Sequence, residues 1–158
     1  MKSLNLMKII CPTKYFSFYI TSNSKKLNLI MIPEKISFLF VLAFFLIVFI
    51  QSGLDKIFDY KGNLNFLNDL LKIYFSPPLI VFALITVTIL EIISGILCLI
   101  GIVDFIFNNS TLIGLLGLIT GSIALLILLF GQRVSKNYDG AKTIAIYFIL
   151  AMIGIALA

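Results

Sequence analysis

The chain has 158 residues, of which 61% are hydrophobic and 12% are charged, and its mean hydropathy is +1.14. Soluble globular domains are about half apolar and about a quarter charged, so this composition excludes an ordinary soluble protein and predicts an integral membrane protein. The net charge of +5 fits Lys and Arg residues that flank membrane spans and meet anionic lipid head groups. We therefore expect the lipid bilayer, and no nucleic acid, as a partner.

The sequence lacks the residues of the commonest metal and redox sites. It contains no His, and its two cysteines, Cys11 and Cys98, do not form a CxxC motif. His is the usual general base and a frequent ligand of zinc and haem iron. We therefore expect no metal site and no dithiol redox motif.

Residues 1–35 are interpreted as an N-terminal tail that is disordered or lies upstream of the true start. They contain six lysines, and their apolar segment at 15–20 is too short to span a membrane. No small-residue cleavage site follows it closely, which argues against a signal peptide. Met31 stands just before the first long apolar run, so we expect the chain to start there rather than at Met1.

Residues 36–158 are predicted to form one membrane domain. Four apolar runs are each long enough for a helix of about 20 residues, at about 36–54, 79–103, 111–130 and 141–158. Short connections between them predict an all-α, four-helix antiparallel bundle in the membrane. The polar segment 59–76 has hydrophobic residues at helical spacing, which fits either a short amphipathic helix at the membrane interface or a solvated loop. Gly114, Gly117 and Gly121 form a small-residue face for close packing of the third span.

The distribution of basic residues bears on membrane orientation. The connections after the first and third spans share one side of the membrane and contain Lys56, Lys61, Lys72, Arg133, Lys136 and Lys142. If the chain starts at Met31, only Lys35 opposes them, and both connections are expected in the cytoplasm. If it starts at Met1, the counts on the two sides are equal. We expect a multi-pass protein of the cell inner (plasma) membrane of a bacterium.

Glu91 is the most unusual residue of the spans, because it lies in the long apolar run TVTILEIISGILCLI. An unpaired carboxylate at the centre of a bilayer costs roughly 3 kcal/mol or more. At helical spacing, Glu91 shares one face with Thr88, Ser94 and Cys98, and this face is expected to turn inward. Glu91 is then either a structural acid or a site for a ligand or a proton.

A second group of polar residues ends the first and third spans: Gln51, Asp55, Lys56, Gln132 and Arg133. Glu91 follows Pro78 by about 20 Å of helix rise. We therefore expect Lys56 and Arg133 to lie too near the surface to pair with Glu91, which would be protonated and hydrogen-bonded inside the bundle. No catalytic residue is evident. The candidate ligand-binding residues are Glu91, Thr88, Ser94, Gln51, Lys56 and Arg133.

Three segments together resemble the DoxX family of membrane proteins: FIQSGLDKIFDYKGN, LEIISGILCLIGI and FGQRVSKNYDGAKTIAIYFILAMIGI. The resemblance covers residues 36–158, and the family pattern falls on Gln51, Ser52, Gly53, Lys56 and Glu91. It implies a four-helix membrane protein related to the redox-associated MauE type. Some members of the family are small subunits of a thiosulfate:quinone oxidoreductase, and others partner thiol-redox or oxidative-stress proteins.

The functional expectation is an accessory subunit of a quinone-linked or thiol-redox membrane system, non-catalytic or dependent on a partner. Other subunits of the redox complex would be its partners, and no cofactor would be bound covalently. A quinone would accept a hydrogen bond from Glu91 between apolar walls. The alternatives are a small proton-coupled transporter, in which Glu91 handles a proton, and a purely structural membrane assembly partner.

Overall fold

A computed structural model describes the backbone of residues 13–158 and the side chains of residues 33–158. The chain divides into two compact units, Met1–Ile36 and Ser37–Ala158. In the first unit, residues 13–36 are helical and form the beginning of α2 (Thr13–Phe58). This helix includes part of the segment interpreted as a tail, whose first 12 residues lie outside the described residues. A start at Met31 stays a prediction.

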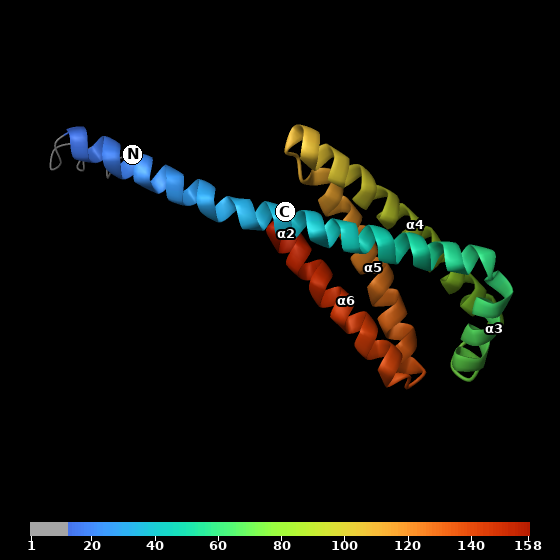
Figure 1. The fold of residues 1–158 in the computed structure, drawn as a ribbon. Helices are drawn as coiled ribbons and strands as arrows, with labels where there is room; N and C mark the ends of the chain where they lie inside the picture. The colour runs from blue at the N-terminus through green and yellow to red at the C-terminus, as the bar shows by residue number, and fades with distance from the viewer. Residues whose placement is uncertain (1–12) are drawn as a thin grey trace. The chain divides into compact units, whose positions relative to one another are not determined.

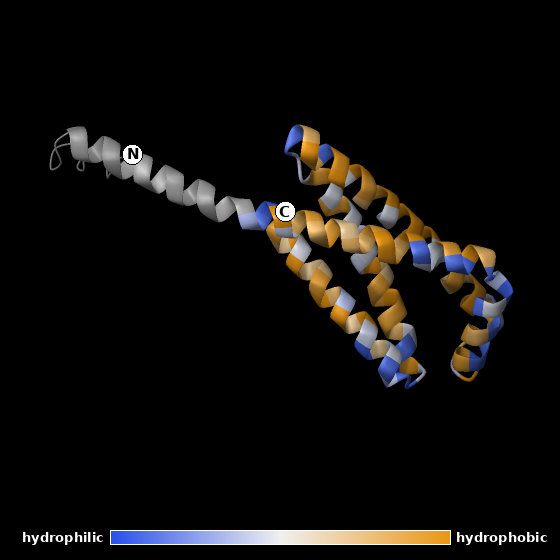
Figure 2. Cartoon of the chain, viewed as in Figure 1, coloured by the Kyte–Doolittle hydropathy of each residue, from blue (hydrophilic) through white to orange (hydrophobic). Residues whose placement is uncertain are grey.

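The second unit is an all-helical bundle, as predicted. After α2 come α3 (Tyr60–Leu71), α4 (Pro77–Asn108), α5 (Leu112–Val134) and α6 (Tyr138–Leu157), and the described residues contain no strand (Figure 1). Within the part of the chain that the structure describes, four helical segments are long and apolar enough to cross a membrane: Pro33–Phe58, α4, α5 and α6. Hydrophobic residues dominate these segments, whereas hydrophilic residues gather on α3 and near the connections (Figure 2). The protein is therefore a multi-pass membrane protein.

Polar residues and prolines set the ends of the helices. Asp59 caps α3 by accepting a hydrogen bond from the Gly62 amide at 3.0 Å, and Pro77 opens α4, where its missing N–H has no cost. Asn137 caps α6 by accepting from the Gly140 amide at 3.3 Å. The segment 59–76 thus contains a helix, which decides between the two structures that the sequence allowed.

Glycines bring α4 and α5 into close contact. A Cβ atom added at Gly101 would collide with the backbone of Gly114. One added at Gly117 would lie 3.0 Å from both the backbone nitrogen and the Sγ of Cys98. The predicted small-residue face of the third span is confirmed, because these glycines leave room for the neighbouring backbone.

Aromatic side chains of α2 fill the centre of the bundle. Phe38, Phe45 and Phe49 are fully buried. The Phe45 and Phe49 rings stack at a centroid distance of 5.1 Å, and Phe38 contacts Phe105 of α4 at 5.6 Å. At these positions α2 therefore packs against the bundle with large rings, whereas α4 and α5 meet through small residues.

Candidate functional site

The buried polar centre of the bundle is an ion pair between α2 and α4. Glu91 is only 1% exposed, and the Lys56 Nζ donates to its Oε2 at 2.8 Å and to its Oε1 at 3.1 Å. Ser52 Oγ donates to the same Oε1 at 3.1 Å and lies 2.7 Å from the Lys56 Nζ. Lys56, Ser52 and Glu91 therefore form a closed triangle of polar contacts.

The local sequence of α2 explains this arrangement. Ser52 and Lys56 are four residues apart and so lie on the same face of the helix. Between them, Gly53 lets α4 approach, since a Cβ at this position would lie 2.8 Å from the Ile92 side chain. This close approach places Ser52 beside Glu91, the neighbour of Ile92 in the chain.

The expectation that Lys56 lies too near the surface to reach Glu91 is wrong. That expectation used the distance along α4 from Pro78 to Glu91 as the depth of Glu91 below the membrane surface. It assumed that the end of the first span and the start of the second lie at the same level. The contact of Gly53 with Ile92 shows that the end of α2 lies beside the middle of α4. α2 also continues to Phe58, which keeps Lys56 one helical turn beyond Ser52.

The other candidate residues do not join the ion pair. Thr88 Oγ1 donates to the Leu84 carbonyl at 2.7 Å, along its own helix. Ser94 is fully buried and donates to the Gly117 carbonyl at 2.7 Å, which ties α4 to α5. Gln51 is exposed. Arg133 is also exposed, and its guanidinium lies 5.2 Å from the centroid of the Tyr138 ring.

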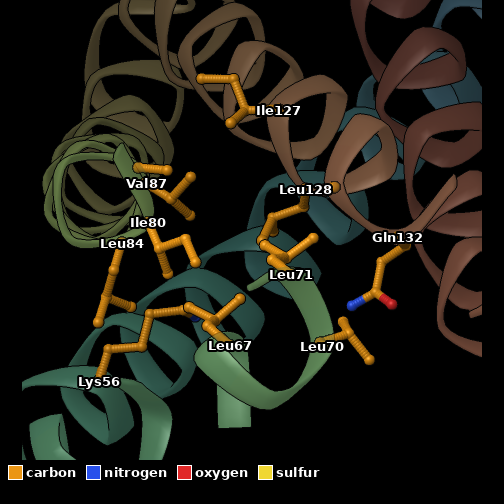
Figure 3. Close-up of a pocket in the computed structure, with 12 residues that line it drawn as sticks. Lys56, Leu67, Leu70, Leu71, Ile80, Leu84, Val87, Ile127, Leu128 and Gln132 are labelled. Carbon is orange, nitrogen blue, oxygen red and sulfur yellow. The ribbon is translucent and has the colours of Figure 1, made fainter. Parts of the chain in front are cut away.

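A pocket of about 70 Å³ adjoins the ion pair. Lys56 lines it, and Glu91 does not. Side chains of α3, α4 and α5 supply the other walls (Figure 3). These are Leu67, Leu70, Leu71, Ile80, Ala83, Leu84, Val87, Ile127, Leu128, Gly131 and Gln132. The pocket is thus almost wholly apolar, with one cation and one carboxamide.

Gln132 presents a hydrogen-bond donor to this pocket. Figure 3 draws its amide nitrogen on the side of Leu70 and its oxygen on the far side. The oxygen is buried without a hydrogen-bond partner, and a Cβ at Gly140 would lie 2.7 Å from it. No hydrogen bond of the nitrogen occurs among the described residues. The pocket therefore offers one donor without a partner, the Gln132 amide, and a second donor, the Lys56 ammonium, that is already bonded to Ser52 and Glu91.

Sequence reasoning noted Gln132 but did not select it. The sequence feature that could have indicated Gln132 is its position at the end of the apolar run of the third span, next to Arg133. The spacing of Leu67, Leu70 and Leu71 fitted an apolar helix face or a solvated loop, and it did not predict that such a face covers a pocket. Among the described residues, no group of three Cys, Asp or Glu side chains could hold a metal ion.

Comparisons with known proteins give no match for this chain. A scan against protein-family models finds no match, and searches of curated proteins and of solved structures find none either.

Proposed function

We propose that this protein is an accessory subunit of a redox system in the membrane, and that its pocket binds the head group of a quinone. One observation supports this most directly: the Gln132 amide nitrogen faces an apolar pocket without a partner. A quinone is an apolar ring with carbonyl oxygens that accept hydrogen bonds. The resemblance of residues 36–158 to the DoxX family supports the same proposal.

The two donors play different parts in this proposal. The Gln132 nitrogen is available to the ligand at once. Lys56 has three N–H bonds, which Ser52 and Glu91 oxygens already engage. Its longest contact, 3.3 Å to the Ser52 carbonyl, is the one that a ligand oxygen replaces most easily. Glu91 acts by holding Lys56 in place, rather than by touching the quinone.

The test is a titration of purified protein with a short-chain quinone, followed by equilibrium dialysis. Gln132→Leu removes the donor at similar volume. A neutral hydrogen bond contributes about 1 kcal/mol, so we expect the Kd to rise about fivefold. Gln51→Leu is the matched control, because Gln51 also lies in a span but does not line the pocket, and its Kd should stay unchanged. Absence of saturable binding by the unaltered protein would refute the proposal.

Proton-coupled transport is the second candidate, because an ion pair buried within the spans borders the pocket. Ionisable residues within spans are common in proton pathways. In liposomes with an imposed pH gradient, a proton flux that disappears with Glu91→Gln would favour transport. No flux above that of empty liposomes would exclude this candidate.

A further inference from the structure

A second chamber adjoins the pocket and differs from it in chemistry. It measures about 170 Å³ and has only apolar side chains and Gly131 in its wall. It shares with the first pocket five lining residues from α3, α4 and α5, among them Leu71, Ile80 and Gly131. The two chambers therefore lie side by side, one with polar donors and one without.

The second chamber reaches the outer surface of the bundle. Leu79 and Phe130 line it and are 48% and 62% exposed. Phe130 is at the end of the third span and contacts Phe75 at a ring-centroid distance of 6.3 Å. The residues at this mouth are apolar, and two of them belong to spans while Phe75 lies in the connection before α4, so we expect the mouth to open toward lipid at the edge of the bilayer.

The sizes of the two chambers fit a ligand that has a ring as its head group and a hydrocarbon tail. The first, at about 70 Å³, is smaller than the cavity of about 150 Å³ that accommodates a benzene ring, whereas the two chambers combined exceed it. A ligand with a ring at Gln132 must therefore extend into the second chamber, where no side chain offers a hydrogen bond. That part of the ligand is a hydrocarbon.

We infer that the second chamber holds the hydrocarbon tail of the quinone, which enters and leaves through the mouth formed by Leu79, Phe75 and Phe130. This inference rests on the proposed function and adds how the ligand is oriented. The ring lies at Gln132 and Lys56, and the tail passes between α4 and α5 toward the bilayer.

The experiment compares a tailless quinone with its decyl homologue, both titrated in the same detergent micelles. Burial of a tail segment should lower the Kd of the decyl homologue by at least about tenfold. Leu79→Trp should obstruct the mouth and remove most of this gain, and it should raise the Kd of the tailless quinone much less than that of the decyl homologue. Leu112→Trp is the control, since Leu112 is also exposed on a span but lies outside both chambers. The decyl homologue partitions into the detergent equally in both experiments, so this effect cancels when the Kd values of the two variants are compared.

Phe130→Ala provides a second variant that removes a wall instead of adding bulk, and it should also reduce the gain from the tail. If the tailless quinone binds and Leu79→Trp keeps the full gain, the inference is wrong while the proposed function stands. If neither quinone binds, the proposed function itself fails. A phospholipid bound at this mouth in place of quinone, detected by native mass spectrometry, would also overturn the inference.

Discussion

Lys56 and Glu91 stabilise the bundle only as a pair. Each is buried or nearly so, and each satisfies the charge of the other at 2.8 Å. Removing one partner from a buried ion pair leaves an unpaired charge, which is strongly destabilising, whereas apolar replacement of both is often neutral. The stability of this site should therefore be non-additive.

We expect Glu91→Leu and Lys56→Met each to lower the free energy of unfolding by about 3 kcal/mol, and the double variant to recover most of the loss. Unfolding in mixed micelles, followed by circular dichroism, measures this. Lys72→Met is the control, because Lys72 and Asp69 form an exposed pair at 3.1 Å and such pairs contribute less than about 1 kcal/mol. Losses that simply add in the double variant would contradict the coupling.

At the level of residues, sequence could predict which side of α4 is buried but not what Glu91 meets there. Helical spacing correctly placed Glu91, Ser94 and Cys98 on one buried face. The partner depended on where α2 crosses α4, and that crossing is set by the fit of Gly53 against Ile92. No periodicity within either helix contains this information.

At the scale of elements, α4 and α5 depend on backbone contact at glycine. A methyl group at Gly101 meets the Gly114 backbone, which cannot rotate away. Overpacking of this kind typically costs 1–3 kcal/mol. The distance between the two helices is therefore fixed by residues that have no side chain.

Gly101→Ala should lower the free energy of unfolding by about 2 kcal/mol. Gly131→Ala is the matched control on α5, because nothing lies within 4 Å of a Cβ there. Ala is favoured over Gly within a helix, so this control should be neutral or stabilising by up to about 1 kcal/mol. The same unfolding assay measures both variants, and equal effects would show that the contact at Gly101 yields to a methyl group.

For the helix α3, sequence could predict only part of what the structure shows. Its apolar spacing fitted a helix and a loop about equally, and the Asp59 cap decides for the helix. That α3 also covers a pocket could not be predicted, because the pocket needs side chains of three helices at once. The four spans could be predicted from sequence, because each apolar run is long enough for a helix that crosses a bilayer.

At the scale of the whole molecule, the order of helices determines which connections face the same compartment. With four spans, Ser76 and Ser135 lie in connections on one side, and Ser110 lies in the connection on the other. Single cysteines at these positions, in a background with Cys11 and Cys98 replaced by Ser, can be labelled with an impermeant maleimide in oriented vesicles. We expect the first two to be labelled together and from the cytoplasmic side if the chain starts at Met31. Labelling of positions 76 and 135 from opposite sides would contradict the four-span topology.

The unequal lengths of the spans have a consequence for the surrounding lipid. α4 has 32 residues and α6 has 20, so their lengths are about 48 Å and about 30 Å. A bilayer core of about 30 Å matches α6, whereas α4 must tilt steeply, extend beyond the core or thicken the lipid around it. Hydrophobic mismatch thus acts on the helix that contains Glu91. Longer acyl chains relieve the mismatch of α4 but create one at α6, so membrane thickness will influence the tilt of α4 and the depth of the ion pair.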